Sequence, residues 1–284
     1  MGRRLAARLL RVADRAPVLS HLARRPDHNL FLLDLAARIG APAPPGELRS
    51  EVAAAWDGAE VAGVVGLRPS IAFDSAADPE AIAALLPYLE TLGVGLIKSE
   101  RAGVDLAWSA LRRRVRRHAL LDRIETAYAL RGAGERLHPP GGPRARPAVV
   151  ADLDALVVAA RESLREEDRP DPFAGDVRSF RRWVRGRIDR ARVVDFQGRV
   201  GMVAYADVQR PEGWLIQGVY TWPELRRRGL AAAGVSDLCR EAFAAGASHV
   251  QLAVVEGNAP ARALYEDLGF EPFGELRTIL FAQA

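Results

Sequence analysis

Strand-like apolar segments occur in similar pairs in the two halves of this chain of 284 residues. In the first half, the apolar stretches within 51–65 flank Asp57-Gly58, and in the second half those within 193–204 flank Gln197-Gly198. A two-residue connection of this kind between two strand-like segments is typical of a β-hairpin. The pattern therefore predicts one hairpin early in each half.

The segments that follow each hairpin also keep one order, namely strand, helix, strand, helix and a long last strand. In the first half these are expected at 69–73, 78–90, 94–98, 102–114 and 119–130. In the second half the first strand is expected to end near 221. The helix, strand, helix and last strand that follow it are expected at about 230–245, 250–255, 258–269 and 275–282. The repeated order predicts a tandem pair of the same α/β fold.

A segment rich in proline and glycine separates the two halves. It contains Gly132-Ala133-Gly134 and Pro139-Pro140-Gly141-Gly142-Pro143, which are typical of a linker. We therefore expect one domain over residues 1–130, a linker over 131–146 and a second domain over 147–284.

The segment 219–231 carries the clearest chemical signal. An apolar run ends at Pro223, a basic loop follows, and Gly229 leads into an alanine-rich helix. The first turn of a helix has unpaired N–H groups and the positive end of the helix dipole, which suit a phosphate or diphosphate. A plain strand-to-helix turn is the alternative interpretation. The glycine spacing matches neither a P-loop nor a dinucleotide-binding fingerprint.

A second cluster begins at Asn258, about thirty residues later. Asn258 can cap a helix, Pro260 suits its first turn, and Gly269 suits a left-handed C-terminal cap. The segment ends in Gly269-Phe270.

Taken together, Arg226-x-x-Gly229-x-Ala231 and Asn258-x-x-Ala261-x-x-Leu264-Tyr265-x-x-x-Gly269-Phe270 resemble the two signatures of the GNAT superfamily of acyl-CoA-dependent N-acyltransferases. The resemblance covers roughly residues 145–284, and the residues around Tyr220-Thr221 are most similar to the glycine N-acyltransferase-like branch. It implies an α/β (α+β) fold of two tandem GNAT-like domains. Each would have a mixed, mostly antiparallel central sheet flanked by helices.

The resemblance also implies roles for individual residues. Main-chain groups of Val219, Tyr220 and Thr221 would hold the pantetheine arm. Asn258, with Ala261 of the same signature, would contact the cofactor near its thioester, and Tyr265 would act as general acid to the CoA thiolate. The expected diphosphate loop consists of Arg226, Arg227, Arg228, Gly229, Leu230 and Ala231.

The general base stays open at this level. Some family members carry a glutamate directly after the leucine of the penultimate strand, and here that position is Ala253. Glu256, Gln217, Asp207 and a water chain are the alternatives. The acidic segment 166–171 either attracts a cationic amine or is a solvated loop.

The first half lacks the glycine loop. The corresponding segment, 74–79, contains Asp74 and Asp78 and no glycine, so it would repel a diphosphate. We expect that this domain does not bind CoA and that it shapes the acceptor pocket; a separate scaffold is the alternative.

Composition narrows the remaining choices. Cys239 is the only cysteine, which leaves no intrachain disulfide and predicts a buried inert thiol. No apolar run reaches the ~20 residues that span a bilayer, so a cytoplasmic protein without a membrane partner is expected. The net charge of +4 is small, and the arginine runs at 112–117 and 178–187 suit solvated helix faces better than a phosphate-binding surface.

The sequence thus predicts an acyl-CoA-dependent N-acyltransferase that uses acetyl-CoA, or another acyl-CoA, as co-substrate and needs no metal. A small-molecule or peptide amine is the expected acceptor, a nucleic acid is not expected as a partner, and a homodimer is left open. A non-catalytic CoA-binding sensor or scaffold is the main alternative. RNA binding through the arginine runs is a further one.

Overall fold

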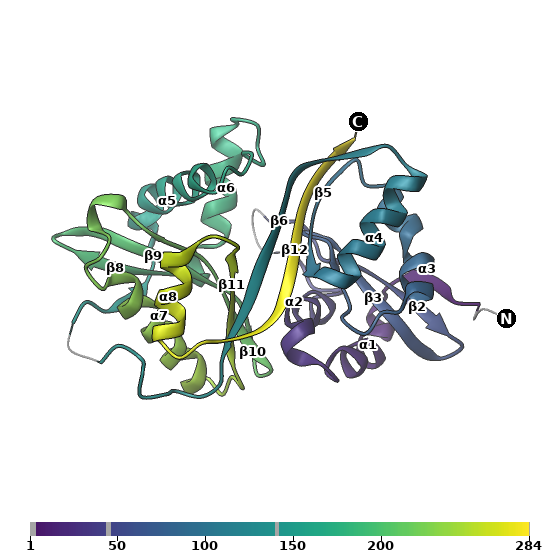
Figure 1. Ribbon diagram of the computed structural model, residues 1–284, viewed down its shortest axis with the longest axis horizontal. Coiled ribbons are helices and arrows are strands. Elements are labelled where there is room, and N and C mark those ends of the chain that lie inside the picture. The colour runs from purple at the N-terminus through teal and green to yellow at the C-terminus, as the bar shows by residue number, and fades with distance from the viewer. Residues whose placement is uncertain (1–3, 44–46, 140–141, 284) are drawn as a thin grey trace. The chain divides into compact units, whose positions relative to one another are not determined.

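A computed structural model describes residues 4–43, 47–139 and 142–283, which form two compact units. The first unit contains 4–43, Leu48–Ala127 and 274–283, and the second contains Glu47 and Tyr128–Phe273 (Figure 1). Residues 140 and 141 of the expected linker lie outside the described residues.

The first unit contains two groups of hydrogen-bonded strands, β1-β2-β3-β4 and β5-β12-β6, with a parallel bridge from Ile71 to Ile97. Its helices and strands are β1 (Ala6–Leu9), α1 (Arg15–Leu22), α2 (Pro26–Ala37), β2 (Glu51–Asp57), β3 (Glu60–Arg68), β4 (Ala72–Phe73), α3 (Pro79–Glu90), β5 (Val94–Glu100), α4 (Arg101–Arg114), most of β6 (Arg117–Leu130) and most of β12 (Glu271–Gln283).

The second unit contains strands in the order β7-β8-β9-β10-β11, antiparallel except for the parallel pair β10–β11. Its helices and strands are β7 (Ala145–Pro147), α5 (Leu153–Glu166), α6 (Val177–Gly186), β8 (Ala191–Phe196), β9 (Arg199–Arg210), β10 (Gly213–Thr221), α7 (Leu230–Ala244), β11 (Val250–Val255) and α8 (Ala259–Asp267). Short 3₁₀ turns occur at Val12–Asp14, Val150–Asp152, Ile188–Arg190 and Pro223–Leu225.

The predicted fold class and both predicted hairpins are confirmed. The strands β2 and β3 pair across the turn at Gly58, and β8 and β9 pair across Gln197-Gly198. Gln197 and Gly198 have φ angles of 51° and 79°, the left-handed values that a tight two-residue turn needs.

The last strand of the first half of the sequence, β6, contributes to the core of the second unit, and the last strand of the second half, β12, contributes to the core of the first unit. Tyr128 and Leu130, at the end of β6, belong to the core of the second unit, and Ile279 and Phe281 of β12 belong to that of the first. Within the first unit, β12 pairs antiparallel with β5, with Ile279 opposite Ile97. The expected boundaries placed β12 in the second domain, because an apolar strand pattern does not specify its partner.

Helices cover both faces of the second unit's sheet. Along β9, Met202 and Ala204 face the core that contains α7 and α8, whereas Val203 and Tyr205 face the core that contains α5 and α6. This alternation follows from the two-residue period of a strand. Two separate apolar cores therefore hold the strands from which the candidate site is built.

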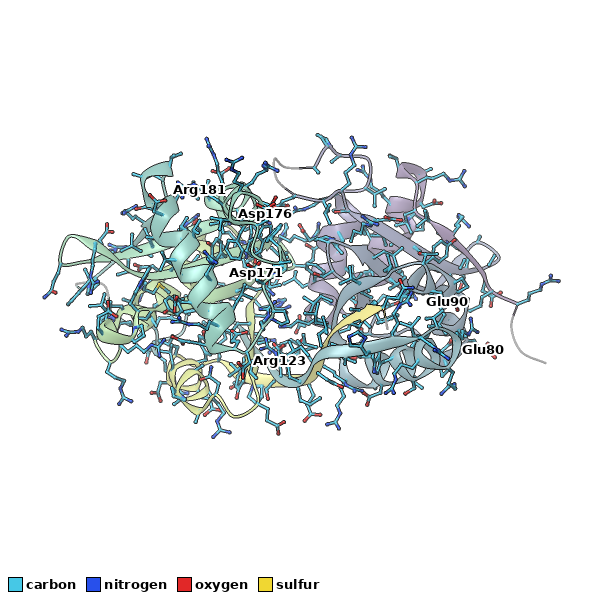
Figure 2. All side chains as sticks on the ribbon, turned by 90° about the horizontal axis from the view of Figure 1, so that it is seen from above. Glu80, Glu90, Arg123, Asp171, Asp176 and Arg181 are labelled. Atoms are coloured by element: carbon cyan, nitrogen blue, oxygen red, sulfur yellow. The ribbon has the colours of Figure 1, made fainter. Side chains whose placement is uncertain are left out.

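Part of the first arginine run supports the end of α3. Arg114 donates to Glu90, which is labelled in Figure 2, at 2.9 Å. Arg117 donates to the main-chain oxygens of Glu90 and Leu92. Cationic groups at the C-terminal end of a helix satisfy its unpaired carbonyl groups. At the other end, Asp78 caps α3 by accepting from Ala81 N at 2.8 Å.

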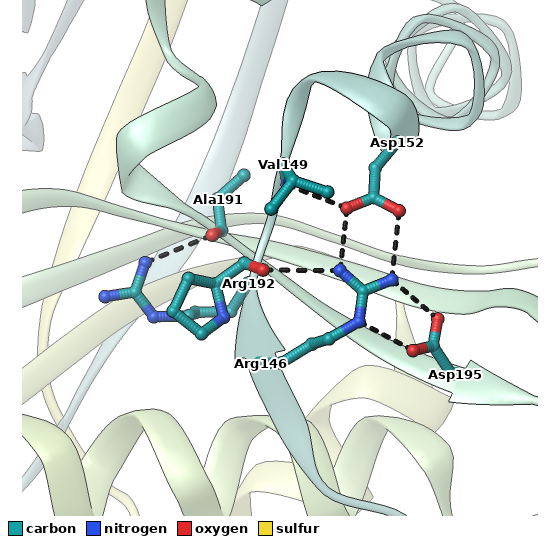
Figure 3. A network of polar contacts seen from close by, with 7 residues as sticks. Arg146, Val149, Asp152, Ala191, Arg192 and Asp195 are labelled. Atoms are coloured by element: carbon teal, nitrogen blue, oxygen red, sulfur yellow. Dashed lines mark hydrogen bonds and ion pairs between the residues drawn. The ribbon is translucent and has the colours of Figure 1, made fainter.

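An ion-pair network precedes α5. Arg146 donates to both carboxylate oxygens of Asp152, at 2.7 and 3.0 Å, and to both of Asp195, at 2.6 and 2.9 Å (Figure 3). Asp152 also accepts from Val149 N at 2.8 Å, so its side chain closes the preceding 3₁₀ turn and makes no capping bond to α5. Over the described residues, no helix combines the length and the apolar character that crossing a membrane requires.

Candidate active site

The strands β10 and β11 separate at their C-terminal ends. They pair only at Trp214–Val250 and Leu215–Gln251, although β10 continues to Thr221 and β11 to Val255. Main-chain groups at the end of β10 that face β11 therefore have no partner on that strand. A bound peptide-like chain could pair with such an edge.

A β-bulge in β10 decides which side chains face which helices. The register with β9 shifts between Gln217 and Tyr220, and Gly218 has a φ of 59°. Ile216 faces the α7 side, but Tyr220, four residues later, faces the α5 side. A regular strand would place both on one face, so the bulge reverses the side chains at the end of the strand.

The glycine loop leads directly into α7. Arg227 and Gly229 have φ angles of 61° and 75°, and Gly229 is the N-cap residue, with no side chain to cap the helix. The first intrahelical bond runs from Ala233 N to Gly229 O. The N–H groups of Leu230 and Ala231 therefore have no intrahelical acceptor, which is the arrangement that suits an anion.

Two of the three arginine side chains of this loop contact neighbouring residues. Arg226 donates to Thr221 O at 3.0 Å and to both oxygens of Glu166 at 2.7 Å. Arg228 lies over the ring of Phe196 at 5.5 Å, and Arg227 is exposed. Sequence reasoning did not identify Glu166 as the partner of Arg226, because the two residues are 60 positions apart.

Asn258 is the N-cap residue of α8. Its side-chain oxygen accepts from Ala261 N at 3.1 Å. The predicted cap is thereby confirmed, and it explains why both residues belong to one signature. The oxygen of this amide is engaged at the helix start.

Tyr265 lies in the core between α8 and α7 and is 6% exposed. Its ring packs edge-on against Phe270, with centroids 5.7 Å apart. Its hydroxyl has no hydrogen-bond partner among the described residues. Burial, followed by the nearby Cys239, raises the pKa of the phenol above its ordinary value, so Tyr265 keeps its proton at neutral pH.

Cys239 is fully buried in α7. Burial raises the pKa of its thiol to about 12, so the reactive thiolate is not formed at neutral pH. This agrees with the expectation of an inert thiol.

The candidate bases differ in their surroundings. Asp207 is 12% exposed and pairs with Arg187 at 2.5 Å. Glu256 is exposed in the turn after β11, and Gln217 is partly buried at the bulge. Ala253, at the position where some family members carry a glutamate, is partly buried within β11. The carboxylate of Asp207 is therefore already engaged in an ion pair.

Two carboxylates in the segment between α5 and α6 accept hydrogen bonds from main-chain N–H groups close to them in the sequence. Asp171 accepts from Phe173 N at 2.8 Å and from Gly175 N at 3.2 Å, and Asp176 caps α6 (Figure 2). These contacts favour a structural role for the two aspartates.

The corresponding loop of the first unit is filled by its own side chains. The carboxylate of Asp74 is completely buried, lies 2.6 Å from His21 Nε2, and accepts from Ala76 N at 2.9 Å. Ser99 Oγ bonds both N and O of Phe73, at 3.0 and 2.8 Å, where β4 meets β5. Asp74 thus stabilises this loop from within, whereas the sequence predicted only that it would repel an anion.

Residues 157–270 match the model of the acetyltransferase (GNAT) family. The matched region runs from α5 to Phe270 and includes the glycine loop and Tyr265. No curated protein matches the sequence.

Solved structures extend the GNAT likeness to both units. A Drosophila protein has a TM-score of 0.69 at 16% identity and covers 98% of each chain. A GCN5-related N-acetyltransferase from Sphaerobacter thermophilus has a TM-score of 0.60 at 15% identity over 99% of this chain and 96% of that one. A tandem GNAT protein from the clavulanic acid biosynthesis pathway has a TM-score of 0.56 at 16% identity over 98% and 97%. The chain therefore has a tandem GNAT fold.

Proposed function

We propose that this chain is an acyl-CoA-dependent N-acetyltransferase that transfers an acetyl group from acetyl-CoA to a primary amine. The observation that carries the proposal is the presence in one unit of the glycine loop at α7, the unpaired edge of β10 and the buried phenol of Tyr265. The match of residues 157–270 to the GNAT family supports the same reaction class.

The residues around the loop fit the phosphate-bearing part of CoA. Among the described residues, leaving out the chain neighbours of Gly229, a Cβ added at Gly229 would have only an atom of His138 within 4 Å. Arg226 to Ala231 would surround the diphosphate with main-chain N–H groups. The edge formed by Val219, Tyr220 and Thr221 would pair with the pantetheine amides. The hydroxyl oxygen of Thr221 is buried without a partner among the described residues, a polar atom that a bound ligand would satisfy.

Tyr265 would serve as the general acid. Acetyl-CoA, once bound, supplies a thioester whose carbonyl carbon forms a bond to the amine nitrogen as its bond to sulfur breaks. A phenol is protonated at neutral pH, so Tyr265 can donate its proton to the departing thiolate. No covalent acyl-enzyme is needed in direct attack, and the protonated thiol of Cys239 agrees with that route.

The proton released by the amine leaves by a route that we assign to no single residue. Glu256, Gln217 and ordered water remain candidates, while the ion pair with Arg187 argues against Asp207.

The catalytic part would be residues 147–284, and the Tyr220-Thr221 region supports the glycine N-acyltransferase-like branch.

Calorimetric titration with acetyl-CoA is the first test, and we expect saturable binding. A thiol-release assay over a panel of primary amines, with mass spectrometry of the products, then tests transfer. Binding followed by no acylated product would favour the CoA-sensing alternative. Absence of binding at millimolar acetyl-CoA would remove the basis of the proposal.

A further inference from the structure

His138, in the segment before β7, lies beside the glycine loop. Its Nε2 atom is 3.8 Å from the position that a Cβ on Gly229 would occupy, and within the described part of the chain no other atom outside the residues adjoining Gly229 lies within 4 Å of that position. His138 is partly buried. Neither GNAT signature includes this residue.

The helix that begins at the loop also holds His138 in place. His138 N donates to Ser236 Oγ at 2.9 Å, and Arg240 donates to His138 O. Leu137, the preceding residue, is buried in the core of the second unit. Because all these anchors belong to α7 or its core, the position of the imidazole relative to Gly229 is set by the same element as the loop.

The surroundings of His138 are mostly cationic. A shallow hollow is lined by His138, Arg144, Asp237 and Arg240, together with small residues. Asp237 pairs with Arg240 at 3.0 Å and lies 3.9 Å from Arg144, so two guanidinium groups face one carboxylate. These three side chains together have a net positive charge of one, which is favourable for an anion nearby.

The ring also has a suitable donor. His138 Nδ1 lies 3.3 Å from Pro139 O, which can only accept, so the hydrogen belongs on Nδ1. In the imidazolium form Nε2 carries a second hydrogen on the side of Gly229. A phosphate oxygen there would receive a charge-assisted hydrogen bond.

We infer that His138 is a phosphate ligand for the CoA part of the co-substrate, donating from Nε2 to a phosphate oxygen beside Gly229. The inference rests on the proposed function. The shared chemistry is an anionic phosphate oxygen, which belongs either to the diphosphate or to the 3′-phosphate. Since the ring contacts phosphate and not the thioester, it contributes to binding and not to the chemical step.

The test is calorimetry with acetyl-CoA and with its 3′-dephospho analogue, combined with steady-state kinetics. His138→Ala should raise the Kd for acetyl-CoA about tenfold, the expected effect of losing one hydrogen bond to a charged group, and leave kcat unchanged. His138→Gln, which retains an N–H donor, should recover part of the affinity. His118→Ala, at an exposed histidine on β6, is the matched control and should not change the Kd.

The dephospho analogue distinguishes the two phosphate sources. A loss that persists with this analogue assigns His138 to the diphosphate, and one that disappears assigns it to the 3′-phosphate. Equal Kd values for wild type and His138→Ala, with acetyl-CoA bound by both, would overturn the inference and leave the proposed function intact. Failure of the wild type itself to bind acetyl-CoA would count against the proposed function.

Discussion

Arg146 and Asp152 form a two-bond ion pair across six positions of the chain, and in the first unit Arg8 and Asp14, at the same spacing, form a one-bond ion pair. In both units the aspartate ends a Val-Ala-Asp 3₁₀ turn and accepts from the N–H three residues before it. The two units therefore begin with the same hydrogen-bonding arrangement. This internal repeat accompanies the repeated order of helices and strands.

The pair with Arg146 makes a pH-dependent contribution to stability. Hydrogen bonds from Arg146 hold the pKa of Asp152 below its ordinary value of 3.8. A lowered carboxyl pKa stabilises the fold above the unfolded pKa, and this contribution is lost as the pH falls through the folded pKa. Asp152→Asn should therefore reduce the free energy of unfolding by about 1–2 kcal/mol at pH 7 and by less at pH 3.

Urea unfolding at the two pH values measures this difference. Asp195→Asn is the matched control, because Asp195 contacts the same guanidinium but is 49% exposed. The Asp195→Asn variant should lose less free energy of unfolding than Asp152→Asn. Equal losses at Asp152 and Asp195 would show that the closed turn adds nothing.

Replacement of the buried phenol tests the acid. Tyr265→Phe keeps the ring that packs against Phe270 and removes the hydroxyl. We expect kcat to fall about ten- to a thousand-fold with little change in the Kd for acetyl-CoA. Steady-state kinetics and calorimetry on the same preparation measure both quantities.

Tyr128→Phe provides the matched control for that variant. Tyr128 is also buried in the second unit, but its hydroxyl donates to Glu266 at 3.1 Å. This change should cost about 1 kcal/mol of stability and leave kcat near the wild-type value. Full activity of Tyr265→Phe across the pH range would mean that another group protonates the thiolate.

The two glycines that flank α7 separate backbone strain from phosphate binding. Gly229 has a φ of 75° and Gly246 a φ of 86°. An alanine at either position should cost about 1–2 kcal/mol, because L-residues are strained in the left-handed region. Only Gly229→Ala should also weaken acetyl-CoA binding, since its methyl group enters the space in front of the loop.

Thermal unfolding and calorimetry on both glycine variants measure these effects. We expect the two variants to lose similar amounts of stability, and only Gly229→Ala to lose affinity for acetyl-CoA. Unchanged affinity in Gly229→Ala would place the phosphate elsewhere.

Glu125 makes the first unit sensitive to acid. Burial alone would raise its pKa, but the charges of Lys98 and Arg123, with hydrogen bonds from Lys98 and Thr278, lower it to about 2. Stability from this group should be complete above its ordinary pKa of 4.5 and decline as the pH falls towards 2. Glu125→Gln should cost about 2–3 kcal/mol at pH 7, because Lys98 loses its buried partner.

The acid dependence is measured by unfolding between pH 2 and pH 7. Glu90→Gln is the control, because Glu90 also pairs with a cation, Arg114, but its side chain is 29% exposed. It should cost less than about 1 kcal/mol. A stability difference between wild type and Glu125→Gln that is the same at pH 2.5 and pH 7 would contradict the assignment.

Local signals in the sequence were sufficient for many elements. Gln197-Gly198 specified its hairpin, and Asp78 and Asn258 each specified the start of a helix, because caps and tight turns depend on residues only a few positions apart. Asp152 also directly precedes a helix, α5, where an aspartate is expected to cap, but its side chain makes no capping bond there and pairs with a residue of β7 instead. That partner, Arg146, precedes it on β7, and no local rule links a strand residue to the turn that follows.

By itself, the sequence determined the two-part α/β order, the glycine loop before α7 and the tyrosine on α8, since each depends on spacing along one segment. Only the tertiary structure decided that β12 completes the first core, that the bulge turns Tyr220 towards α5, and that His138 lies beside Gly229. These relationships join residues far apart in the chain. Their energies come from strand pairing, burial and charge, which exist only once the segments are packed together.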